Sequence, residues 1–197
     1  MNELQRPSDF FSESEIAQLR EISDWRGALS VVHCWAVILF TWVVVATWTN
    51  PLTVILGIMI IGTRQLGLFV LTHDASHMAL LRNRKLNDWV AQWILNRPHT
   101  DASIDVYRRY HIQHHLHTQQ ADDPDLVLSA PFPISKRSLW RKFVRDLSGQ
   151  TGWKQYARLI NSACSGDTWR AKLRNGWARL GPNIIINLIF LAGFSLA

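Results

Sequence analysis

Residues 27–48 read GALSVVHCWAVILFTWVVVATW and contain no Asp, Glu, Lys or Arg. A helix rises about 1.5 Å per residue, so this stretch is long enough to cross a hydrocarbon core of roughly 30 Å. Thr49-Asn50-Pro51 follows, and proline favours the first turn of a new helix. A second apolar run occupies residues 52–72. The sequence therefore predicts an all-α integral membrane protein built around a transmembrane helical hairpin.

The segment before the hairpin differs from it in composition. Residues 1–26 hold six acidic side chains and three arginines, and Ser12 and Glu15 have the spacing of a helix capping box. An acidic segment of this length does not resemble the short basic leader of a secretory signal. We expect a separate N-terminal amphipathic segment in the cytosol, and we favour a membrane span over a buried soluble helix for residues 27–48.

The second apolar run contains Arg64 near its middle. An arginine inside a membrane span usually faces other helices and pairs with a buried group. We expect either a structural contact between helices or a buried pair with Asp74, Asp101 or Asp105. The two cysteines, Cys34 and Cys164, do not have the spacing of a disulfide or thiolate metal site.

Residues 136–180 carry eleven basic side chains and two acidic ones, interspersed with tryptophans. This composition is typical of helices in the headgroup layer, and the position between apolar segments favours anionic lipid over nucleic acid. A docking patch for an acidic electron-transfer partner is the alternative. Residues 183–197 form another apolar run, too short to span. We expect a third transmembrane helix that is cut short, within an incomplete membrane domain over residues 27–197.

Two histidine clusters lie between these apolar segments: His73-Asp74-Ala75-Ser76-His77 and His111-Ile112-Gln113-His114-His115. Helical residues three and four apart share a face, so each cluster presents its imidazoles to one side. Imidazole is a good ligand for iron, zinc, copper and nickel. The sequence predicts metal binding by His73, His77, His111, His114 and His115. His117 points away from this face and is expected to be a surface or supporting side chain, while His33 and His99 are expected to be structural.

These clusters, together with Asn83-Arg84-Lys85-Leu86-Asn87-Asp88 and Asp123-Pro124-Asp125, resemble the first two histidine boxes of the membrane fatty acid desaturases. The resemblance covers roughly residues 27–197. It implies cytosolic helices over four transmembrane helices, two irons, O2 as co-substrate, a fatty acyl substrate, and electrons from a cytochrome b5, ferredoxin or similar donor. It also implies that the five histidines are iron ligands, and that Asp74 orients an imidazole.

The third histidine box of that family does not occur in this sequence. We therefore expect a C-terminally truncated chain with a partial ligand set and no turnover of its own. The scarcity of basic residues in the turn between the two spans predicts that the histidine boxes face the cytoplasm.

Three other functions remain open from the residues. A related di-iron hydroxylase or ketolase acting on alkanes, sterols or carotenoids begins with the same hydrogen abstraction. A zinc hydrolase would use Asp74 as general base, although glutamate is the usual residue beside paired zinc histidines. A non-catalytic membrane protein is the third.

Overall fold

The computed structural model describes residues 6–98, 100 and 103–195, which are helical, with turns and loops between the helices. The chain divides into two compact units, Met1–Asp88 and Trp89–Ala197. The boundary falls near the end of a short helix, α4 (Arg84–Trp89). The predicted all-α fold is confirmed for the part of the chain that the structure describes.

The first unit begins with the short helices η1 (Pro7–Asp9) and α1 (Glu13–Leu19). The capping box predicted from the sequence is present at the start of α1. The Ser12 hydroxyl accepts a hydrogen bond from the Glu15 backbone N–H at 3.3 Å, and the Glu15 carboxylate accepts one from the Ser12 N–H at 2.8 Å. Two of the backbone donors that a helix start leaves without partners are thereby satisfied.

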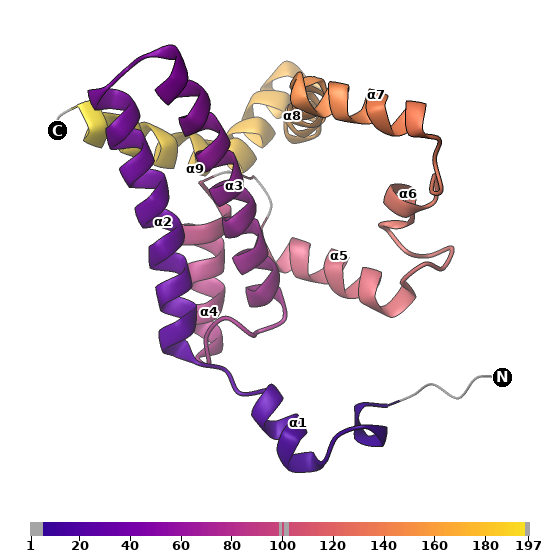
Figure 1. Cartoon of the computed structure of the whole chain (residues 1–197). Helices are drawn as coiled ribbons and strands as arrows, with labels where there is room; N and C mark the ends of the chain where they lie inside the picture. The colour runs from indigo at the N-terminus through magenta and orange to yellow at the C-terminus, as the bar shows by residue number, and fades with distance from the viewer. Residues whose placement is uncertain (1–5, 99, 101–102, 196–197) are drawn as a thin grey trace. The chain divides into compact units, whose positions relative to one another are not determined.

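The long helices α2 (Asp24–Thr47) and α3 (Pro51–Ser76) form the predicted hairpin and lie side by side in opposite directions (Figure 1). The tight turn is closed by Asn50, whose side-chain oxygen accepts from the N–H groups of Leu52 and Thr53 at 3.0 and 3.1 Å. Pro51 occupies the first helical turn, as predicted. The candidate membrane spans, Glu13–Thr47 and Pro51–Ser76, are long and apolar enough to cross a bilayer.

Small and weakly polar side chains lie where the two long helices pack against each other. Cys34 and Thr41 on α2 and Gly57 on α3 are buried, while large apolar side chains such as Phe40 and Ile58 are 69% and 68% exposed. A hydrophobic driving force between helices is lacking in lipid, so close packing of small residues takes its place. The exposed apolar side chains suit a lipid environment.

Gly27 allows a close approach between the start of α2 and the loop that follows α3. A Cβ atom at Gly27 would lie 2.2 Å from the carbonyl oxygen of Leu80, whereas a Cβ at Gly62 would meet nothing within 4 Å. The Arg82 N–H in the same loop donates to the Asp24 carboxylate at 2.7 Å. This contact sets where the chain leaves the hairpin.

We expect Gly27→Ala to destabilise the protein by about 1–3 kcal/mol, because the new methyl group displaces backbone rather than a flexible side chain. Gly62→Ala is the matched control and should be neutral or stabilising, since alanine favours a helix more than glycine does. Denaturant unfolding of the two variants in detergent micelles measures the difference. Equal stabilities would contradict the close contact at Leu80.

The second unit contains η2, α5, α6, α7, α8 and α9. Their bounds are Val90–Asn96, Ile104–His117, Leu126–Ser129, Lys136–Leu147, Gln150–Ala163 and Trp169–Ser195. The first of these is a π-helix, and its sequence VAQWILN is mostly apolar. Helix α5, which carries the second histidine cluster, is capped at its start by Ser103 and ends at His117.

The apolar run that begins at residue 183 lies in helix α9, which begins at Trp169 and runs through Pro182. Its first half carries basic residues, and α9 is not one of the described helices that meet the length and hydropathy of a span. The amides of Asn183 and Asn187 donate to the carbonyl groups of Arg97 and Pro98 at 2.7 and 3.0 Å. The apolar run that begins at residue 183 is thus the C-terminal part of a longer helix, and its role as a membrane span stays a prediction.

Candidate metal centre

In the first unit, the last turn of α3 carries the first histidine cluster. His73 and His77 have ring centroids 4.9 Å apart, and each offers a ligand nitrogen within 4.8 Å of the other. His73 lies 22 residues beyond Pro51, which corresponds to roughly 33 Å of helix. The pair therefore sits at the far end of a helix that is just long enough to cross a hydrocarbon core.

Asp74 lies beside His73, with 3.3 Å between the His73 Nδ1 and an Asp74 carboxylate oxygen. Such a contact leaves the His73 Nε2 as the nitrogen that can bind a metal. The geometry matches the supporting role expected of Asp74, and that role stays a prediction.

Asn87 on α4 holds the turn that carries these histidines. Its side chain is fully buried, and its amide N–H donates to the carbonyl of Ala75 at 2.9 Å. Its oxygen accepts from the Leu81 N–H at 3.3 Å. The chain between them passes through Met78 with a left-handed φ of 58°. One buried amide thus connects the end of α3 to the loop after it.

Replacing Asn87 with alanine is expected to lower the free energy of unfolding by about 1–3 kcal/mol, because two buried backbone groups lose their partner. Asn161→Ala, at an exposed position on α8, should change stability by less than about 0.5 kcal/mol. Thermal unfolding in detergent measures both variants. Similar midpoints for the two would show that Asn87 does not hold the turn.

In the second unit, α5 presents the second cluster. The Nε2 atoms of His111 and His115 are 3.0 Å apart, and His111 is buried with 9% of its surface exposed. Two nitrogens bound at about 2.1 Å to one ion, at roughly a right angle, would be separated by about 3.0 Å. The aromatic ring of Tyr107 stacks on His111 with 5.5 Å between centroids. The pair therefore fits a shared metal ion.

His114 lies on the same side of α5 and is held by a different group. Its Nδ1 is 2.7 Å from a carboxylate oxygen of Asp123, whose side chain is completely buried. This hydrogen bond raises the pKa of His114 above its usual value. With Nδ1 carrying the shared proton, Nε2 of His114 is left as the metal-binding nitrogen.

Asp123 is fixed by the loop after α5. Its second oxygen accepts from the Gln119 N–H at 2.8 Å, and the first also accepts from the Asp125 N–H at 2.8 Å. Burial opposes ionisation of Asp123, but hydrogen bonds from His114 and the two backbone groups hold the pKa of Asp123 below its usual value. Gln119 adopts a left-handed φ of 62°, which turns the chain back towards α5.

Tyr110 on α5 also connects this helix to the loop that follows it. Its hydroxyl donates to an Asp125 carboxylate oxygen at 2.6 Å, which raises the pKa of Tyr110 to about 12. It also contacts the Pro124 carbonyl at 3.2 Å. From the sequence, Asp123-Pro124-Asp125 was identified only as part of the resemblance to the second histidine box, with no role for either carboxylate. The missed signal was a pair of carboxylates a short turn beyond a histidine-bearing helix.

The remaining predicted site residues are placed as follows. His117 ends α5 and is partly exposed, so its supporting role stays a prediction. Cys34 and Cys164 are free cysteines. His99 and Asp101 lie outside the described residues.

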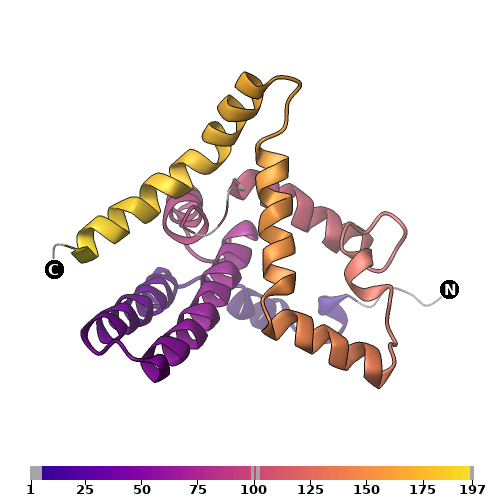
Figure 2. The ribbon, with the colours of Figure 1, turned by 90° about the horizontal axis from the view of Figure 1, so that it is seen from above.

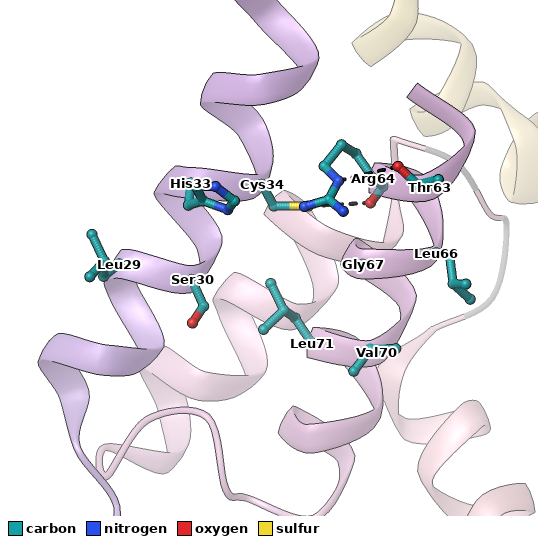
Figure 3. Close-up of a pocket in the computed structure, with 10 residues that line it drawn as sticks. All are labelled: Leu29, Ser30, His33, Cys34, Thr63, Arg64, Leu66, Gly67, Val70 and Leu71. Atoms are coloured by element: carbon teal, nitrogen blue, oxygen red, sulfur yellow. Dashed lines mark hydrogen bonds between the residues drawn. The ribbon is translucent and has the colours of Figure 1, made fainter. Parts of the chain in front are cut away.

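Arg64 lines a pocket of about 620 Å³ between α2 and α3. Figure 3 shows its side chain extending towards His33 and Cys34 on α2. Its Nε donates to the Thr63 hydroxyl at 3.4 Å, and the Cys34 thiol donates to the Arg64 carbonyl at 3.2 Å. Two carboxylates considered as its partners have other neighbours: Asp74 contacts His73, and Asp105 contacts Arg108. A buried ion pair for Arg64 stays a prediction.

Each of the two helices offers imidazole nitrogens, and on each helix a carboxylate lies beside one of the histidines. Such sets suit transition metals and do not suit magnesium or calcium. A chain with this chemistry at the end of a membrane-length helix has the features of a membrane metalloenzyme.

Comparison with known proteins agrees with this class. The model of the fatty acid desaturase family matches residues 46–197, and the chain therefore belongs to that family of oxidoreductases. A zeaxanthin 4-ketolase from Chlamydomonas reinhardtii is 40% identical over 67 residues, which cover 33% of this chain and 15% of the ketolase. No solved structure matches the chain significantly.

Proposed function

We propose that this chain belongs to an enzyme that desaturates a fatty acyl chain, carried by coenzyme A or by a lipid, with O2 and a histidine-bound di-iron centre. The observation that carries the proposal is the 3.0 Å separation of the His111 and His115 nitrogens beside the Asp123-held His114. This geometry prepares nitrogen ligands in advance of a metal. Family membership over residues 46–197 supports iron as the proposed metal.

The proposed ligands come from both helices. His73 and His77 on α3 would supply one group, and His111, His114 and His115 on α5 the other. When bound, the irons would supply the O2 activation needed to attack an unactivated CH2 group, which side-chain acids and bases cannot do. Asp74 and Asp123 would orient His73 and His114 and fix which ring nitrogen carries the proton.

The reaction balance identifies a further partner. Removing two hydrogens from the acyl chain while reducing O2 to two waters consumes two additional electrons and two protons. We propose that a reduced one-electron donor of the cytochrome b5 or ferredoxin type supplies these electrons. The product is one carbon–carbon double bond, and the acyl substrate would enter from the lipid phase.

The proposed location is a multi-pass position in the membrane with the histidines on the cytoplasmic side. The turn at Thr49-Asn50-Pro51 has no basic residue, whereas the chain beyond His77 is rich in arginine and lysine. Positive residues are retained on the cytoplasmic side of membranes. The end of α3 that carries His73 would then face the cytoplasm.

Two measurements test this function. Metal analysis of the protein purified from iron-supplemented cells should find iron, whereas zinc without iron would favour a hydrolase. Expression with a reduced donor in a host of known lipid composition should yield new double bonds, detected by mass spectrometry of the fatty acids. The measurement applies to the chain and to any longer protein that contains it. If iron is found but neither the chain nor a longer protein that contains it yields a new lipid product, the result would support a non-catalytic metal protein.

The second candidate is a ketolase or hydroxylase of the same family, favoured by the similarity to a zeaxanthin 4-ketolase. A ketolase would act on a carotenoid ring, and hydroxylation would leave an oxygen in the product. A host that produces zeaxanthin separates the possibilities. Keto-carotenoids without changes in the fatty acids would replace the desaturase proposal.

A further inference from the structure

Helix α7 has two chemically distinct faces. Leu139, Phe143 and Leu147 follow one another at four-residue intervals on one side, and Arg137, Arg141 and Arg145 do so on another. Residues four apart share a helix face, and the offset of two between the series places them on different sides. Trp140 and Val144 extend the apolar face. The helix is therefore strongly amphipathic.

The apolar face of α7 lies open in the described part of the chain. The exposed fractions reach 88% for Leu147 and 68% for Trp140, and no side chain of α7 is buried. Several large apolar side chains in a row on one exposed face indicate a surface that contacts a broad apolar phase. A single exposed leucine would not indicate such a surface.

Helix α8 repeats the pattern. Trp153, Tyr156 and Ile160 lie on one face with 77%, 58% and 50% of their surface exposed. Lys154 and Arg158, four residues apart, lie on the opposite side. Tryptophan and tyrosine are the side chains enriched where hydrocarbon meets headgroups.

The corner between α7 and α8 is fixed by local contacts. Gly149 adopts a left-handed φ of 76°, and only two residues separate the end of α7 from the start of α8. Figure 2 shows the sharp corner between these two helices, drawn in orange. The Asp146 carboxylate accepts from Lys142 at 2.6 Å and from the Thr151 hydroxyl at 2.5 Å. Asp146 bridges the end of α7 and the start of α8, so both amphipathic helices belong to one local unit.

The charge of α7 and α8 indicates which kind of surface they bind. Helix α7 has five basic residues and one acidic residue, and α8 has two basic residues and no acidic one. A basic amphipathic helix with aromatic residues binds anionic membranes through apolar insertion and attraction to the headgroups together. An acidic protein would satisfy the arginines but would leave Trp140, Phe143 and Leu147 without an apolar partner.

We propose that α7 and α8 form an in-plane hairpin that binds the anionic headgroup layer of a bilayer, with its apolar faces towards the acyl chains. The inference goes beyond the proposed reaction, because it requires a membrane and no particular chemistry. It assigns these helices a preference for anionic lipid. The exposed apolar and basic side chains on two consecutive helices carry it.

The test uses spin labels in the full chain, with Cys34 and Cys164 replaced by serine. One label is placed by Phe143→Cys on the apolar face, and the control by Arg141→Cys on the basic face. The protein is reconstituted into nanodiscs of phosphatidylcholine, with and without about one-third phosphatidylglycerol. Collision of each label with oxygen and with a water-soluble nickel complex reports its depth.

In nanodiscs with phosphatidylglycerol, the Phe143→Cys label should be protected from nickel at least about tenfold more than the Arg141→Cys label. Phosphatidylcholine alone or high salt should reduce this difference, and so should adding Arg137→Gln and Arg145→Gln to the labelled protein. Trp153→Cys and Lys154→Cys provide an independent pair on α8 if an α7 variant misfolds.

Equal nickel access for the labels of both pairs in the anionic nanodiscs would overturn the proposal. Protection of the same extent in both lipids would overturn the preference for anionic lipid. Protection in detergent without lipid that grows with protein concentration would instead assign the apolar face to a second copy of the chain. Lipid product formation is not measured, so these outcomes are separate from failure of the proposed reaction.

Discussion

Changing His111 and His115 together to alanine is expected to lower metal affinity by more than about 100-fold, since loss of a supporting group alone costs 10–100-fold. Their Nε2 atoms are 3.0 Å apart, a separation that fits two ligands of one ion. The start of α5 is capped by Ser103, which both substitutions leave in place, and alanine favours a helix, so α5 should persist. Metal content per protein after dialysis against a weak chelator measures the loss.

Gln113→Ala is the matched control, because Gln113 is exposed on the same helix between the two histidines. Its metal content should equal that of the unmodified protein. Circular dichroism separates loss of ligands from loss of α5. A double variant that keeps its full metal content and its helicity would remove His111 and His115 from the ligand set.

The second large effect is expected from Asp123→Ala, which should weaken metal binding by about 10–100-fold while every histidine stays in place. Asp123 holds Nδ1 of His114 at 2.7 Å and also accepts hydrogen bonds from two backbone N–H groups. Without it, the imidazole gains rotational freedom and the choice of protonated nitrogen is lost. The loop after α5 should loosen as well.

Asp122→Ala serves as the control, because Asp122 is exposed and directly precedes Asp123. Asp123→Asn gives a sharper comparison, since it keeps the size of the side chain but removes the charge. Metal titration of the three variants, followed by ligand-field absorption, distinguishes a positioning role from general unfolding. Wild-type affinity in Asp123→Ala would contradict the role assigned to Asp123.

Much of the fold followed from local sequence patterns. The charge-free run before Trp48, the Asn50-Pro51 start and the Ser12 capping box are each encoded within a few neighbouring residues. Each of these patterns forms a helix or a helix cap through helix periodicity and the transfer of apolar side chains out of water. The structure contains all three. The extension of α9 upstream of residue 183, through Pro182, did not follow from hydropathy, because the first half of the helix is rich in basic residues.

The sequence by itself determined the two histidine clusters, their helical spacing and the membrane-length helix that carries the first of them. Only the tertiary structure placed Asp123 on His114, Asp125 on Tyr110 and Asn87 beneath the last turn of α3. The physical reason is the separation along the sequence between the residues that make contact. Helical spacing fixes neighbours three and four residues apart, whereas a carboxylate nine residues away reaches its histidine only if the intervening turn folds back. That turn depends on the left-handed backbone of Gln119 and on the hydrogen bonds that bury Asp123.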